Sequence, residues 1–98
     1  IMKEILNQIF DIEQKSEKNE LHVFDRNIRR LYHEIESLGF EIKNPLGEKY
    51  SLERTDIEAT LMNDFHSKMK ITKVLKPIIY KSENGHMTLV QRGVVIVE

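Results

Sequence analysis

Apolar and polar residues alternate with two different periods along the chain, and the change falls near residue 39. Before it, apolar residues recur every three or four positions, which places them on one face of an α-helix. This predicts one amphipathic helix over about residues 1–17 and a second over about residues 25–38, with a polar stretch from Lys15 to Glu20 between them. The apolar residues of the two stripes are Met2, Ile5, Ile9, Ile12, Phe24, Ile28, Leu31, Ile35 and Leu38.

Local signals mark the ends of the second helix. Asp25 suits its start, because a short carboxylate accepts hydrogen bonds from the free N–H groups of a first helical turn. Gly39 suits the left-handed position that follows a last turn, with Phe40 placed to contact Ile35. We therefore expect this helix to end near Leu38.

A hairpin of two helices has too little core to be stable alone. Two copies would form a four-helix bundle in which each apolar stripe meets another. We therefore expect a parallel homodimer through the helices. The residues expected at its interface are Ile5, Ile9, Ile12, Ile28, Leu31, Ile35 and Leu38.

After Gly39 the period shortens toward two, which is typical of strands. Asn84-Gly85 is the clearest hairpin signal, because both central positions of a type I′ turn need positive φ. The β-branched run from Val94 to Val97 predicts a strand buried on both faces or nearly so. The segments with strand character are Phe40–Lys43, Ile57–Met62, Ile71–Leu75, Ile78–Tyr80, His86–Val90 and Val94–Val97. The predicted fold class is therefore α+β, with two amphipathic helices followed by a small, mainly antiparallel β domain.

Length and composition limit the organisation and the location of the protein. A chain of 98 residues has room for one compact unit, with a helical dimerisation segment at 1–39 and a small β domain at 40–98. No apolar run approaches the roughly 20 residues of a membrane span. The lack of cysteine and of a signal-peptide layout favours a cytoplasmic protein. The opening Ile1 indicates a piece of a longer chain or the remnant of a tag.

No pattern in the sequence supports catalysis. The four histidines lack the i, i+4 spacing of a helical zinc site. No serine lies in a nucleophile-elbow motif, and Gly47 and Gly85 stand alone rather than in a phosphate-binding loop. Asp56 and Glu58 share one face of a strand, which we interpret as solvated surface rather than an acid–base pair. The sequence predicts a binding module that is not an enzyme and uses no metal or cofactor.

An alternative function rests on the densest basic cluster, which consists of Arg26, Arg29 and Arg30. These side chains would suit a dimeric nucleic-acid-binding protein. However, the formal net charge is −1, so the field of the whole protein does not attract nucleic acid. Carboxylates also neighbour the cluster and predict a mixed-charge helix surface; they are Asp25, Glu34 and Glu36. We therefore do not expect nucleic acid as a partner, and a purely structural dimerisation module is the remaining alternative.

Several short motifs follow one another along the chain. They are Ile35–Glu41 at the end of the second helix, Pro45–Tyr50, Glu58-Ala59, Val74-Leu75-Lys76, Tyr80-Lys81, Asn84-Gly85 and Arg92–Val97. In this order they resemble the GrpE family, the nucleotide exchange factors of DnaK-type heat-shock chaperones. The likeness covers nearly the whole chain, from the family's last bundle helix to the closing strand of its β domain.

Some positions depart from the pattern of the GrpE family. Ser51-Leu52 stands where the family has Asp-Pro, and Ile57 stands where it has a His before Glu-Ala. Ile79 replaces a Gly, His86 an Arg and Gly93 a Pro. By the resemblance, these loops face the chaperone, so the departures indicate a divergent DnaK-like partner.

The resemblance implies a homodimeric co-chaperone that performs no bond chemistry. The family's β domain docks on the nucleotide-binding domain of the chaperone and favours an open cleft from which ADP leaves, and its long paired helices would precede Ile1. We expect Val94 and Ile96 inside the β domain. Two interpretations are open for Leu75 and Val97, a chaperone contact or a place in the core. The residues expected to bind the chaperone are Leu75, Tyr80, His86, Arg92 and Val97.

Overall fold

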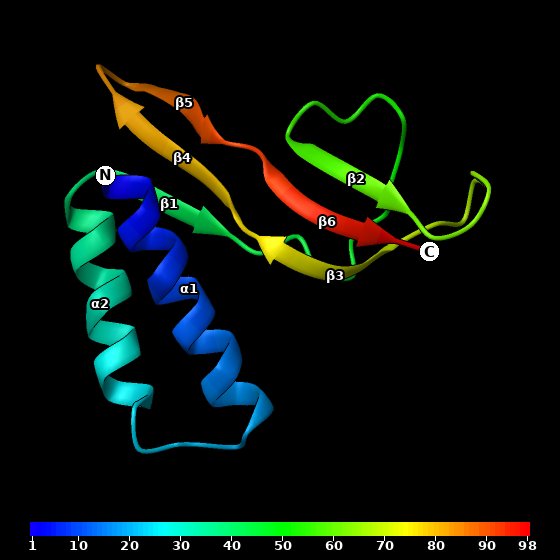
Figure 1. The fold of residues 1–98 in the computed structure, drawn as a ribbon. Coiled ribbons are helices and arrows are strands. Elements are labelled where there is room, and N and C mark those ends of the chain that lie inside the picture. Colours follow the sequence, from blue (N-terminus) through cyan, green and yellow to red (C-terminus); the bar gives the residue numbers. More distant parts are fainter.

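The computed structural model describes all residues from 1 to 98. Two helices, α1 (Met2–Lys18) and α2 (Asp25–Ser37), precede six strands. The strands are β1 (Phe40–Lys43), β2 (Ile57–Leu61), β3 (Ile71–Lys76), β4 (Ile78–Glu83), β5 (His86–Gln91) and β6 (Gly93–Val97). The α+β class is confirmed, and every predicted helix and strand is present within two or three residues of its expected ends (Figure 1). Neither helix combines the length and hydropathy that crossing a membrane requires.

The β residues form two three-stranded sheets rather than one, in the orders β1-β4-β5 and β2-β6-β3. A long bent hairpin connects them, because β4 pairs with β5 in the first sheet and β3 with β6 in the second (Figure 1). The bend falls at Pro77 on one arm and Arg92 on the other. Proline has no N–H to donate to a ladder, so the hydrogen-bonding pattern is interrupted at Pro77. All pairings are antiparallel except that of β2 with β6.

The turn signals read from the sequence act as expected, but the helix cap does not. Asn84 and Gly85 have φ of 50° and 80°, which confirms the type I′ hairpin, and Gly39 has φ of 89° after α2. Asp25 is the first residue of α2 rather than its cap, and no side chain caps that end. The Asp25 carboxylate instead lies 3.2 Å from Nδ1 of His22.

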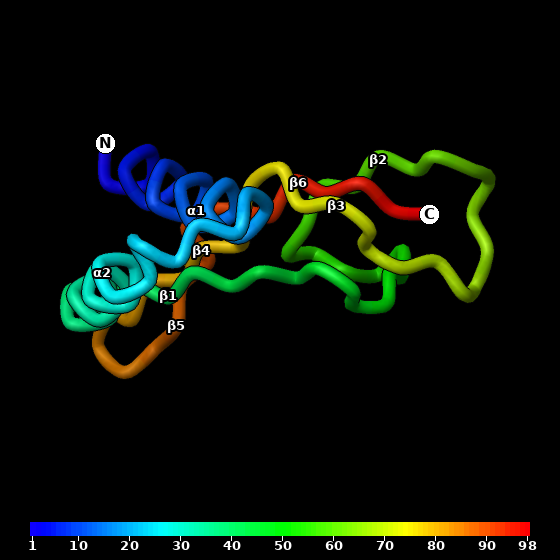
Figure 2. Tube along the Cα trace, turned by 90° about the horizontal axis from the view of Figure 1, so that it is seen from below, coloured from blue at the N-terminus to red at the C-terminus, as the bar shows by residue number.

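The helices pack on the first sheet through a small buried cluster. Leu6 of α1, Ile35 of α2 and Ile79 of β4 form its centre, and Phe40 and Ile42 of β1 pack around it. The two helices lie side by side at one end of the molecule, connected by a loop (Figures 1 and 2). Gly39 lies at the junction of α2 and β1, and the first sheet shares its core with the helices across this junction.

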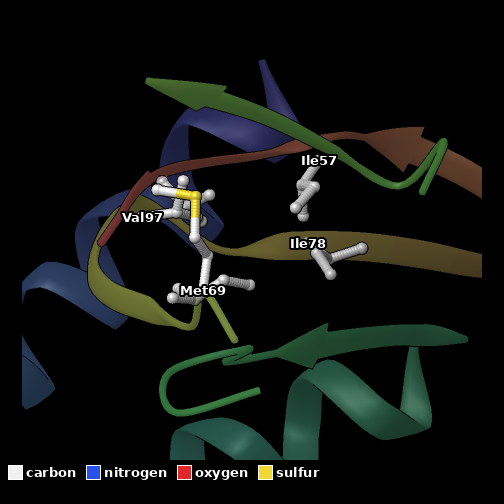
Figure 3. Close-up of a cluster of buried hydrophobic side chains, with 6 residues drawn as sticks. Ile57, Met69, Ile78 and Val97 are labelled. Atoms are coloured by element: carbon white, nitrogen blue, oxygen red, sulfur yellow. The ribbon is translucent and has the colours of Figure 1, made fainter. Parts of the chain in front are cut away.

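A second core lies under the β2-β6-β3 sheet at the other end of the molecule. Figure 3 shows Met69 beside Val97, and Ile57 facing Ile78. The full cluster consists of Ile57, Met69, Ile71, Ile78, Val95 and Val97. Gly93 allows this close packing, since a Cβ there would lie 2.9 Å from Cγ1 of Ile78.

Strand β6 buries the opposite set of residues from the one expected. Val95 and Val97 are fully buried, whereas Val94 and Ile96 are only half-buried. The reason is that neighbouring segments cover only one face of this sheet, so the β-branched run alternates between core and surface. Val97 therefore belongs to the core, the second of the two interpretations that the sequence left open, and it is not available to a partner.

Candidate protein-interaction surfaces

The protein exposes more surface than a chain of its mass normally does. Its accessible surface is 7038 Å², whereas a folded monomer of 11.6 kDa is expected to expose about 5,800 Å². The radius of gyration is 14.6 Å, against about 13 Å expected for this length. The additional accessible surface of roughly 1,200 Å² is larger than the area that one partner buries in a standard protein interface, which is about 800 Å². Two apolar surfaces are exposed.

The first surface is a column of apolar side chains along the helices. Each helix has an inner column that the chain itself covers; on α2 it contains Ile28 and Ile35, and on α1 it contains Leu6 and Phe10. The next column on each helix is exposed. We call it the outer column, and it consists of Met2, Ile5, Ile12, Phe24, Leu31 and Leu38. Of the residues expected at a dimer interface, Ile5, Ile12, Leu31 and Leu38 are thus exposed, Ile9 is half-buried, and Ile28 and Ile35 are buried within one chain.

A hydrogen bond holds the two helices in this arrangement. The Tyr32 hydroxyl donates to Oε1 of Glu13 over 2.8 Å. Burial, followed by the Glu13 carboxylate, raises the pKa of Tyr32 above its usual value, so the hydroxyl remains a donor. This bond links α2 to α1 beside the outer column.

The second surface follows β5, an edge strand of the first sheet. Every residue from His86 to Val90 is exposed, on both faces of the strand. Leu89 pairs with Tyr80 of β4, so their side chains share one face. We call the two faces of this strand together the β5 surface: Tyr80, Met87 and Leu89 lie on one face, and His86 and Val90 lie on the other. An exposed apolar edge strand invites pairing or docking by another chain.

The residues expected to bind a chaperone do not form one patch. His86 begins β5 at the hairpin tip, and Arg92 follows the end of that strand. They are six positions apart in the sequence, which is about 20 Å of extended chain. Tyr80 lies between them, half-buried, and Leu75 is exposed at a bulge of β3 near the bend. Tyr80 and His86 share the β5 surface, while Leu75 and Arg92 lie near the bend.

Arg92 has a structural role at the bend. Its guanidinium donates to the carbonyl of Ile57 over 2.7 Å and lies 3.5 Å from Oε1 of Glu58. These contacts fasten the arm between β5 and β6 to strand β2. Glu58 therefore forms an ion pair with Arg92, and it does not form an acid–base pair with Asp56.

Asp56 belongs to a separate ion-pair cluster around Arg54. Arg54 donates to the two Asp56 carboxylate oxygens over 3.0 and 2.8 Å and also contacts Glu48 at 3.1 Å. Hydrogen bonding from Arg54 is the main reason that the pKa of Asp56 lies below its usual value. The same bond raises the pKa of Arg54. This cluster holds the segment before β2 and has the geometry of a structural clamp.

The sequence pattern gave no indication of Met87, Leu89 and Val90 as surface residues. Alternation along a strand predicts one buried face, and β5 has none because it is an edge strand that no segment covers. Only the pairing order of the sheet reveals this. No group of three or more His, Asp or Glu side chains in the structure could hold a metal ion. The chain matches no family model, no curated protein and no solved structure.

Proposed function

We propose that this protein is a GrpE-like nucleotide exchange factor, a homodimeric co-chaperone that binds the nucleotide-binding domain of a DnaK-type chaperone and promotes release of ADP. The observation that carries the proposal is the presence of two uncovered apolar surfaces on one small chain. The outer column of the helices suits a second copy, and the β5 surface suits a different partner. Two separate surfaces are what a dimer that docks on another protein needs.

The order of elements adds support. The motifs on which the resemblance to the GrpE family rests fall at the corresponding junctions of this chain. Gly39 follows the last helix, and Asn84-Gly85 forms the turn of the β4–β5 hairpin. This agreement in the order of elements is one reason for the proposal.

The proposed mechanism is differential binding between proteins. A partner that binds the open state of a nucleotide cleft better than the closed state shifts the population toward the open state. The shift cannot exceed the ratio of the two affinities. The β5 surface contributes apolar contacts to this binding. We place the chaperone contact on Leu75, Tyr80 and His86 together with Met87 and Leu89.

Release of a fluorescent ADP analogue from DnaK-type chaperones of the same organism tests the proposal. The wild-type protein should accelerate release. Met87→Ser with Leu89→Ser should reduce the acceleration by about tenfold or more, because two central contacts together contribute more than about 1.4 kcal/mol. The variant with Leu75→Ala and His86→Ala tests two positions named from the sequence, and it should also reduce the acceleration of release.

The matched control changes the same chemistry at the other end of the molecule. Leu52→Ser with Met62→Ser alters two exposed apolar residues outside the β5 surface, and it should leave the acceleration unchanged. Circular dichroism verifies that each variant folds. If no chaperone responds to the wild type, the exchange-factor proposal is rejected. If the wild type accelerates release and the folded β5 variants accelerate it equally, the proposed location of the surface is rejected.

A further inference from the structure

The arginine cluster of α2 lies on a face that the proposed functions leave unused. With about 100° of rotation per residue, Arg26, Arg29, Arg30 and His33 lie on the side of α2 that is opposite to its apolar stripe. All four residues are exposed. A partner that covers the outer column, including a second copy of the chain, would leave this face open to solvent.

The carboxylates that neighbour the cluster form no direct ion pair with it. None of the three arginines forms an ion pair, whereas Arg54 and Arg92 both do. Asp25 lies against His22 instead. The three guanidinium groups are therefore not held by direct ion pairs, although Glu34 lies beside the cluster and Asp25 lines the pocket next to Arg29.

The side chains of the cluster border an open surface depression of about 480 Å³ that no hydrophobic residue lines. Its lining residues are Arg26, Arg29, Arg30, His33 and Glu34. From Arg26 to His33 the helix rises about 10 Å. One strand of a nucleic-acid duplex carries a phosphate about every 3.4 Å along its axis, so the face is long enough to contact about three phosphates.

We propose that this face of α2 binds the phosphate backbone of a nucleic-acid duplex without sequence preference. The planar guanidinium group suits phosphate because it presents donors in a fork. The face has no aromatic side chain on which single-stranded bases could stack. The residues that line it also include no apolar side chain to enter a membrane. This proposal does not rest on the chaperone proposal, and each can fail without the other.

Fluorescence anisotropy of a labelled duplex, measured between 50 and 200 mM salt, tests the proposal with the full chain. Contact with about three phosphates predicts a slope of log K against log salt near −2.7, or about 40-fold weaker binding across this range. Arg29→Glu should weaken binding by about tenfold or more and reduce the slope by about one. Glu34→Gln should tighten binding, and two unrelated duplex sequences should bind equally.

Lys73→Glu is the matched control, since it makes the same change of charge at an exposed residue of β3. It should change the affinity by less than about twofold. Absence of salt-dependent binding, or equal losses for Lys73→Glu and a folded Arg29→Glu variant, would overturn the proposal. So would binding to vesicles that contain anionic lipid but not to the duplex, because the face would then serve a membrane surface.

Discussion

At the scale of single residues, a few polar contacts set the geometry of the β unit. The Arg54–Asp56 pair is bidentate, and both side chains are less than a third exposed, at 17% and 24%. A pair of this kind contributes more than a flexible surface ion pair, since its geometry is fixed and partly shielded from water. It joins the segment before β2 to Glu48 in the loop after β1.

Replacement of Asp56 should reveal this contribution through its pH dependence. Because the pKa of Asp56 is lowered in the folded state, the pair stabilises the fold above the unfolded pKa of about 3.9 and is lost as the pH falls through the folded value. Asp56→Asn should lower the free energy of unfolding by about 1 kcal/mol at pH 7, and the difference should narrow below about pH 3.9. Urea unfolding at several pH values measures both effects. Asp64→Asn, at an exposed loop position without an ion pair, should show neither. A pH-independent difference for Asp56→Asn would contradict the interpretation.

At the scale of elements, α1 is fastened to the β hairpin by a pair of amides. Asn7 donates to Gln91 over 2.8 Å, and Gln91 donates back to Asn7 over 2.8 Å and to the carbonyl of Pro77 over 2.8 Å. These bonds meet at the bend where the hairpin passes from one sheet to the other. The orientation of the helix pair relative to both sheets therefore depends on them.

Removal of either amide should loosen α1 from the sheet. Asn7→Ala and Gln91→Ala should each cost about 1–2 kcal/mol, because each leaves a half-buried amide without its partner. The double variant should cost less than the sum, with a coupling of about 0.5 kcal/mol or more. Hydrogen exchange should accelerate along α1 more than along β6, whereas Asn27→Ala on the exposed side of α2 should change little. Additive costs would show that the two amides act independently.

At the scale of the whole molecule, flatness explains the exposed surfaces. The principal extents are 40, 39 and 20 Å. The two sheets are joined end to end by the bent hairpin rather than stacked face to face (Figures 1 and 2). Each consequently has its own small core, and only 15 of the 98 residues are buried. A chain arranged in this way gains stability when a partner covers its remaining apolar surface.

Dimerisation through the outer column should be abolished by charge. Ile5→Glu with Leu31→Glu places carboxylates on two residues that are exposed in the single chain, so the fold should tolerate both changes. The wild type should be a dimer at micromolar concentration and the variant a monomer, as measured by light scattering. Gln8→Glu with Asn27→Glu adds the same charge to polar positions of the helices and should remain dimeric. A monomeric wild type would contradict the dimer, as would a dimeric double variant at Ile5 and Leu31.

The local structure of this protein follows from short-range patterns in its sequence. Helix and strand periods, the left-handed Gly39 and the Asn84-Gly85 turn depend on residues close together in the chain, and each is present in the structure. Tertiary structure alone decided which surfaces are exposed. The burial of Val97, the exposure of β5 and the separate partners of Arg54 and Arg92 follow from pairings between distant segments. Periodicity can show that a strand has two faces, but which face is covered depends on what packs against it, and local spacing carries no information about that.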